Sequence, residues 1–142
     1  ISPILLEMRE RNQRSFSIYS GVSLEVDKAQ GLNGECDFIL AKQPATYDIQ
    51  VPIVALVEAK DDNIKTGLPQ CTAQMLGARL FNKQRGNAIE IIHGCVTTGE
   101  DWQFLRLEEN TIIVDSQRYY IKTVEEILGV WQQIIDFYLP TR

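Results

Sequence analysis

The chain has 142 residues, 44% of them hydrophobic and 23% charged, which is typical of one globular domain with a buried core. A net charge of −5 argues against nucleic-acid binding through a broad basic surface, although it leaves a local basic groove open. No apolar stretch approaches the length of a membrane span and no signal-peptide pattern is present, so we expect no membrane partner. The three widely spaced cysteines, Cys36, Cys71 and Cys95, form no CxxC pair and suit a reducing cytoplasm, which we expect as the location.

A helix, three strands and a second helix are predicted for the first part of the chain. The sequence begins at Ile1 rather than Met, which is compatible with a truncated N-terminus. Ser2-Pro3 is typical of a helix start, with Ser2 as the N-cap. Three strands with short connections then predict a meander. The expected segments are helix Pro3–Gln13, strands Phe16–Tyr19 and Val22–Val26, strand Gly34–Ala41, strand Val51–Lys60 and helix Gln70–Gln84.

The rest of the chain predicts further strands and a last helix. The expected segments are strand Ala88–Thr97, strand Trp102–Leu107, short strands Thr111–Val114 and Arg118–Ile121, and helix Thr123–Leu139. The last helix has apolar residues at helical spacing, Trp131 among them. If this stripe is wider than one sheet can cover, it provides the surface of a homodimer. The element order predicts one α/β domain over residues 1–142, with a mixed sheet and helices on both faces.

Two acids and a lysine are predicted to meet at the end of a buried strand. Ile53–Val57 is apolar without alternation, as expected of a strand buried on both faces. It runs into Glu58-Ala59-Lys60, and the period of two puts Glu58 and Lys60 on one face. If the strand carrying Asp37 pairs antiparallel with it, Asp37 lies across from Glu58. Buried charges need partners, so the group is either an ion-pair cluster or a binding site for a divalent cation.

These residues resemble the PD-(D/E)XK nuclease superfamily, which has the restriction-endonuclease-like fold. The family's signature is an acid on the second strand and (D/E)-x-K on the third, matched by Asp37 in GECDF and by Glu58-Ala59-Lys60 in VEAK. The following run, GLPQCTAQMLGARLFN, is also similar to a set of uncharacterised cyanobacterial proteins with this fold. Cys36 stands where the family name has proline. The resemblance covers roughly residues 1–97 and implies a three-layer core, with the later hairpin region and last helix outside it.

The resemblance implies a nuclease that hydrolyses phosphodiester bonds with Mg²⁺ or Mn²⁺, on DNA in preference to RNA. Oxygen ligands and bound water are what Mg²⁺ prefers. The implied catalytic residues are Asp37, Glu58 and Lys60, with Gln70 and Gln74 on the following helix. The implied metal ligands are the carboxylates of Asp37 and Glu58, the backbone carbonyl of Ala59 and, through water, Glu7.

Several assignments stay open at this level. Glu7 is equally compatible with a solvated ion pair to Arg11 one turn later, and Glu10 matches the family's acid on the first helix less well. His93, the only histidine, fits a hydrogen-bonded sheet residue better than a general base. The same fold can also be a catalytically inactive domain that binds a nucleic acid or a protein, and such a module need not bind Mg²⁺ tightly.

Overall fold

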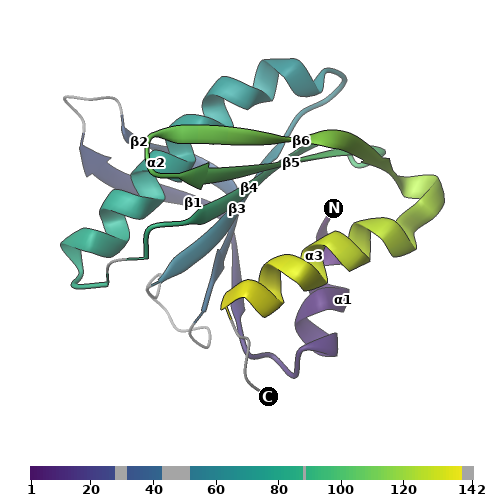
Figure 1. The fold of residues 1–142 in the computed structure, drawn as a ribbon, viewed down its shortest axis with the longest axis horizontal. Helices are drawn as coiled ribbons and strands as arrows, with labels where there is room; N and C mark the ends of the chain where they lie inside the picture. Colours follow the sequence, from purple (N-terminus) through teal and green to yellow (C-terminus); the bar gives the residue numbers. More distant parts are fainter. Residues whose placement is uncertain (28–31, 43–51, 88, 139–142) are drawn as a thin grey trace.

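The computed structural model describes residues 1–27, 32–42, 52–87 and 89–138 (Figure 1). Its elements follow the predicted order of helix, meander, helix and further strands. In chain order they are α1 Ser2–Arg11, β1 Ser17–Asp27, β2 Leu32–Ala41, β3 Ile53–Ala59, the 3₁₀ helix η2 Ile64–Gly67, α2 Leu68–Gln84, β4 Ile92–Thr97, β5 Asp101–Glu108, β6 Thr111–Tyr120, the 3₁₀ helix η3 Ile121–Thr123, and α3 Val124–Tyr138.

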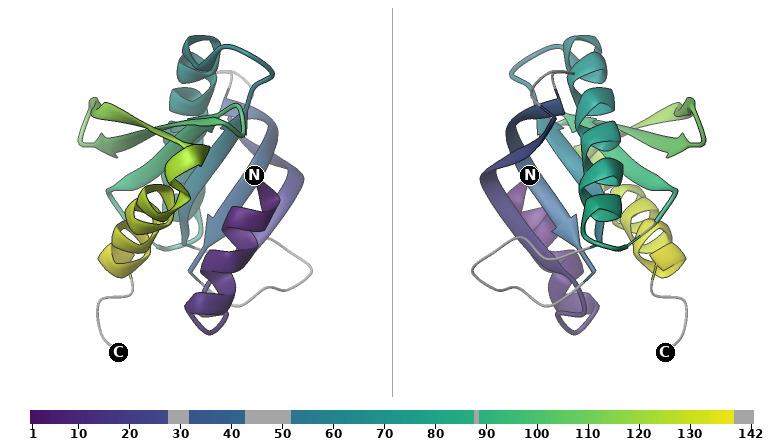
Figure 2. Two further views of the ribbon diagram at one scale, coloured as in Figure 1. Left: turned by 90° about the vertical axis from the view of Figure 1, so that its right-hand side faces the viewer. Right: turned by 90° about the vertical axis from the view of Figure 1, so that its left-hand side faces the viewer.

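The described strands form one mixed six-stranded sheet in which each strand lies beside the next one in the chain. β1, β2 and β3 pair antiparallel, as the meander prediction required. β4 pairs parallel with β3, because the chain crosses over through α2 before it returns to the sheet. β5 and β6 extend the sheet as an antiparallel hairpin, which projects from the body in Figure 2.

Helices cover both faces of the sheet, which confirms the predicted α/β class. α1 and α3 lie side by side on one face, and α2 lies on the other (Figures 1 and 2). β3 serves both layers, with Ala55 and Val57 in the core under α1 and α3 and with Leu56 in the core under α2. Burying a large aliphatic side chain of this kind stabilises the fold by about 1.5–3 kcal/mol. The prediction of a strand buried on both faces is therefore confirmed.

The apolar stripe of α3 is used inside the molecule. Trp131 is fully buried and packs edge-on against Phe104 of β5. Asn12, at the end of α1, donates from Nδ2 to Oε1 of Gln132 at 3.1 Å and accepts from Nε2 of Gln132 at 2.9 Å, which joins the two helices. The sheet and α1 thus cover the side of α3 that carries Trp131.

Several local expectations were wrong. β1 is one strand rather than two, because Gly21 adopts a left-handed backbone (φ +59°) that lets the chain bend without ending the pairing. β6 is also continuous, with a register shift opposite Gln103, whose buried amide donates to the carbonyl of Asp115 at 2.9 Å. The N-cap of α1 is Ile1, not Ser2. The strand expected over Ala88–Thr97 begins only at Ile92, so the described residues 89–91 are not part of it. The element ends expected at Val51, Ala88 and Leu139 themselves lie outside the described residues.

Candidate active site

Asp37 lies at the edge of the site, where β2 meets the end of β3. Phe38 pairs with Val57, so the next position of the antiparallel register puts Asp37 across from Glu58. The backbone N–H of Ala59 donates to Oδ2 of Asp37 at 2.9 Å. This bond holds the Asp37 carboxylate against β3 and leaves its side chain half-buried.

Glu58 is the buried acid of the pair. Only 4% of the residue is exposed, and Nε2 of Gln74 donates to its Oε2 at 2.8 Å. Burial raises the pKa of Glu58, the hydrogen bond from Gln74 opposes that rise, and the nearby charge of Asp37 adds to it. A buried carboxyl with a raised pKa beside a second carboxylate is the arrangement found at functional sites more often than elsewhere.

Lys60 continues the line of β3 toward solvent. Its backbone N–H donates to the carbonyl of Thr97 at 2.9 Å, which extends the pairing with β4 beyond the end of the strand. Its Nζ donates to Oε1 of Gln70 at 2.6 Å and lies 3.8 Å from Oε1 of Glu58. The ammonium group is therefore held between the buried acid and an exposed amide.

The two glutamines of α2 serve different partners because they lie one helical turn apart. Four residues of α-helix advance about 6 Å, so Gln70 reaches Lys60 near the surface while Gln74 reaches Glu58 further inside. Pro69, in the first turn of the helix, lacks an N–H that would have no helical partner there. The structure thus brings together all five residues that the resemblance implied as catalytic.

Gly67 supports this arrangement and was not anticipated. A Cβ at this position would lie 2.7 Å from Cγ1 of Val96 and 3.1 Å from Cγ of Lys60. Val96 is fully buried and cannot retreat, so only glycine lets η2 pack directly on the stem of Lys60. The only sequence signal was a glycine two positions before Pro69, which does not by itself identify a contact with Lys60.

Glu7 is not part of this group. It is exposed on α1, and its Oε2 accepts a hydrogen bond from Nε of Arg11 at 2.7 Å. α1 packs with α3 on the face of the sheet opposite α2, where Glu58 meets Gln74. Glu10 is likewise paired with Arg14, at 3.0 Å. The Glu7–Arg11 contact is the solvated ion pair that the i,i+4 spacing predicts as the alternative to a role in the site.

The remaining ionisable candidates have structural partners. Nδ1 of His93 lies 2.7 Å from the hydroxyl of Tyr138, and burial lowers the pKa of His93 to about 4. The three cysteines are buried and unpaired, and burial raises the pKa of Cys36 to about 12. Such thiols stay protonated near neutral pH and are poor nucleophiles.

Asp37 and Glu58 lie among groups that could complete the coordination shell of a cation. The two carboxylates supply hard oxygen ligands, and Ala59 between Glu58 and Lys60 adds a backbone carbonyl. Oε1 of Gln74 is buried without a hydrogen-bond partner in the described chain, so a polar acceptor beside Glu58 is left for water or another donor. No group of three or more His, Cys, Asp or Glu side chains gathers among the described residues. A cation here therefore needs the backbone carbonyl and water to complete its shell, which the donor set allows.

Glu58→Gln is expected to raise the free energy of unfolding of the metal-free protein at neutral pH. A carboxyl whose pKa is raised on folding contributes stability below its unfolded-state pKa, and this contribution is lost as pH rises through the folded-state pKa. Glutamine does not titrate, and the amide of Gln74 can turn to give it the orphaned Oε1. Urea unfolding from about pH 4 to pH 8 should show the variant's advantage growing through that window. Parallel curves for the two proteins would contradict the raised pKa.

Fold and site together define the class: an α/β domain with a mixed sheet, and an acid–acid–lysine cluster at the end of a central strand. Comparisons with protein-family models, with curated proteins and with solved structures found no match. In the part of the chain that the structure describes, no helix is long and apolar enough to span a membrane.

Proposed function

We propose that this protein is a metal-dependent nuclease that hydrolyses phosphodiester bonds, with Mg²⁺ or Mn²⁺ as its cofactor. The observation that carries the proposal is the convergence of Asp37, Glu58 and Lys60 at one strand end, with Gln70 and Gln74 delivered by α2. These residues are the ones through which the sequence resembles the PD-(D/E)XK signature. The restriction-endonuclease-like form of the α/β fold is part of the same proposal, and so is the preference for DNA over RNA.

The residues of the cluster would have different roles in hydrolysis. Asp37, Glu58 and the carbonyl of Ala59 would hold the cation, which supplies a bound water of lowered pKa and polarises the scissile phosphate. Lys60, fixed by Gln70, places a positive charge where negative charge develops on the phosphate oxygens. The hydrogen bond that Gln74 donates to Glu58 opposes the rise in pKa caused by burial, and so favours the ionised carboxylate as a ligand.

Among the described residues, few basic side chains lie close enough to the site in sequence to contact a nucleic-acid phosphate. Lys65 is exposed on η2, between Lys60 and the start of α2. Arg79, further along α2, donates from Nη1 to the carbonyl of Glu109 at 2.6 Å and ties the helix to the β5–β6 turn. The net charge is −5, so binding of a nucleic-acid phosphate backbone through such a small basic area should weaken steeply as salt is added.

The direct test is digestion of supercoiled plasmid and linear DNA by the wild-type protein at low salt. We expect cleavage with Mg²⁺ or Mn²⁺ and none with EDTA, because the scissile phosphate needs the cation that Asp37 and Glu58 hold. Plasmid nicking without shortening of linear DNA would identify endonuclease action. Cleavage that continues in EDTA would show that the reaction does not need a divalent cation, and would contradict the proposed mechanism.

A catalytically silent domain of the same fold, acting as a binding or assembly module, is the second candidate. One observation favours it: Glu58 and Asp37 already have protein partners in Gln74 and the N–H of Ala59. A binding titration with Mn²⁺ separates the two candidates. No detectable metal binding together with no cleavage would favour the silent module over the nuclease.

A further inference from the structure

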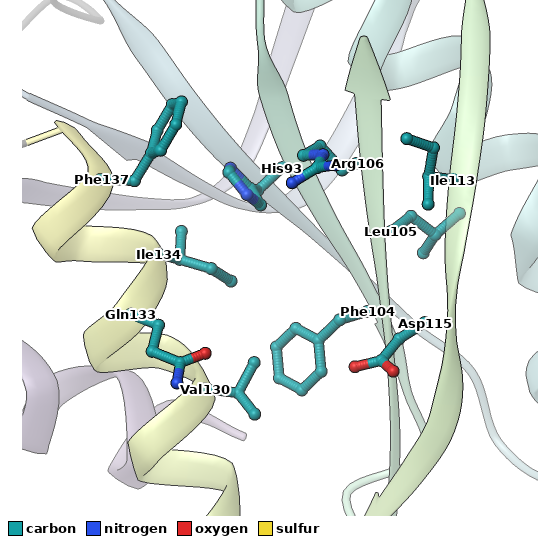
Figure 3. Close-up of a pocket in the computed structure, with 10 residues that line it drawn as sticks. All are labelled: His93, Phe104, Leu105, Arg106, Ile113, Asp115, Val130, Gln133, Ile134 and Phe137. Carbon is teal, nitrogen blue, oxygen red and sulfur yellow. The ribbon is translucent and has the colours of Figure 1, made fainter.

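A pocket lies far from the proposed catalytic cluster, between α3 and the outer strands of the sheet (Figure 3). His93, at its edge, pairs with Ala55, whereas Thr97 pairs with Ala59 at the catalytic end of β3. The two positions are therefore separated by four residues of strand, about 13 Å. The pocket also opens on the face that carries α3, opposite α2. Nothing in the proposed nuclease chemistry uses it.

The pocket's polar side is made by two neighbouring strand residues with unused hydrogen-bonding capacity. His93 of β4 and Arg106 of β5 are direct cross-strand partners. The Arg106 side chain is 43% exposed, its carboxylate neighbour Glu108 is 3.6 Å away, and its Nε is buried without a hydrogen-bond partner in the described chain. A guanidinium in this position retains donors for an anion.

His93 adds an acceptor beside that cation. The hydroxyl proton of Tyr138 goes to the carbonyl of Ile91 at 2.8 Å, so Nδ1 of His93 must be the donor in its 2.7 Å bond to Tyr138. The ring is neutral at physiological pH, because burial and, to a smaller extent, the nearby charge of Arg106 lower the pKa of His93 to about 4. The unprotonated nitrogen is then Nε2, for which no partner is found among the described residues.

The rest of the pocket is apolar. Phe104 lies at its base and Phe137 of α3 at its rim, where 50% of Phe137 is exposed. Asp115 of β6 lies on the opposite side of the pocket from α3, and its Oδ2 accepts a hydrogen bond from the hydroxyl of Tyr119 at 3.2 Å. Because the Asp115 carboxylate is negatively charged, it disfavours an anion at that end of the pocket. An anion is thus directed to the Arg106 end.

We propose that this pocket of about 360 Å³ binds a small organic anion: its aromatic or apolar body lies between Phe104 and Phe137, its carboxylate or sulfonate lies on Arg106, and an N–H or O–H group faces His93. The volume falls in the range of roughly 300–1,000 Å³ that is usual for small-molecule sites. The mixture of an apolar lining with a few placed polar groups is also what such sites have.

Fluorescence titration with anilinonaphthalene sulfonate, which carries aromatic rings, a sulfonate and an N–H, tests the proposal on the whole chain. We expect the dye to bind at one saturable site. Indole-3-acetate should displace it, whereas the methyl ester of this acid, which has the same rings without the charge, should not. Arg106→Gln should weaken binding by about tenfold, the loss of one charge-assisted hydrogen bond. Arg14→Gln, an exposed arginine outside the pocket, is the matched control.

Val130→Trp is a second variant, which fills the pocket from α3 while leaving Arg106 intact, and it should abolish binding. Circular dichroism confirms that each variant is folded. Equal displacement by the acid and the ester, or equal affinities of the Arg106→Gln and Arg14→Gln variants, would overturn the proposal. Concentration-dependent self-association without binding of the dye, lost in Val130→Trp, would make a second copy of the chain the occupant and overturn it as well.

Discussion

Asp37→Asn is expected to lower Mg²⁺-dependent DNA cleavage by at least about 100-fold, because it removes one of the two carboxylates that the proposal assigns to the cation. Asparagine keeps a side-chain oxygen that can still accept the N–H of Ala59, so the β2–β3 junction should be preserved. The loss should therefore appear in metal binding and in cleavage, with little change in stability. Mn²⁺ titration, a plasmid-nicking assay and urea unfolding measure the three quantities.

Lys60→Ala separates charge stabilisation from metal binding in the same cluster. Removing the ammonium group should cost about 100- to 1,000-fold in cleavage, the usual effect of losing one group that stabilises transition-state charge. Metal binding should be retained, since both carboxylates remain. Asp136→Asn and Lys122→Ala, exposed positions on α3 and η3, are the matched controls. Cleavage that persists unchanged in Asp37→Asn and Lys60→Ala would remove the proposed site.

Asn82→Leu is expected to lower the free energy of unfolding by about 2–5 kcal/mol, the largest stability effect anticipated in this chain. Asn82 is fully buried near the end of α2. Its Oδ1 accepts from the backbone N–H of Ile53 and its Nδ2 donates to the carbonyl of the same residue, both at 2.8 Å. Leucine fills a similar volume but leaves a backbone donor and an acceptor unsatisfied at the buried start of β3.

Urea unfolding of Asn82→Leu beside Gln84→Leu tests this, because Gln84 is an exposed residue on the same helix. The control should change the unfolding free energy by no more than about 0.5 kcal/mol. Asn82→Asp should also destabilise the fold, since it retains the acceptor, loses the donor and buries a charge. An Asn82→Leu protein as stable as the control would show that the two backbone groups find other partners.

The core of the fold could be predicted because its signals are local. The unbroken apolar run Ile53–Val57 indicates a strand buried on both faces whichever helices cover it, and it lies at the centre of the observed sheet. Gly21 and the register shift opposite Gln103 were misread for the opposite reason. Each is a local irregularity that pairing with the neighbouring strand tolerates, and a single-strand pattern does not show its neighbour.

For the site, the chain's sequence alone determined that an acid, then Glu58-x-Lys60, and then two glutamines would follow one another on strand, strand and helix. Only the tertiary structure decided that Gln74 holds Glu58 while Gln70 holds Lys60, that Glu7 stays with Arg11 in solvent, and that Gly67 backs Lys60. The physical reason is that alternation and helical period set which way a side chain leaves its own element. Which partner it meets depends on strand register and on the position of each helix over the sheet, and these result from packing of the whole core.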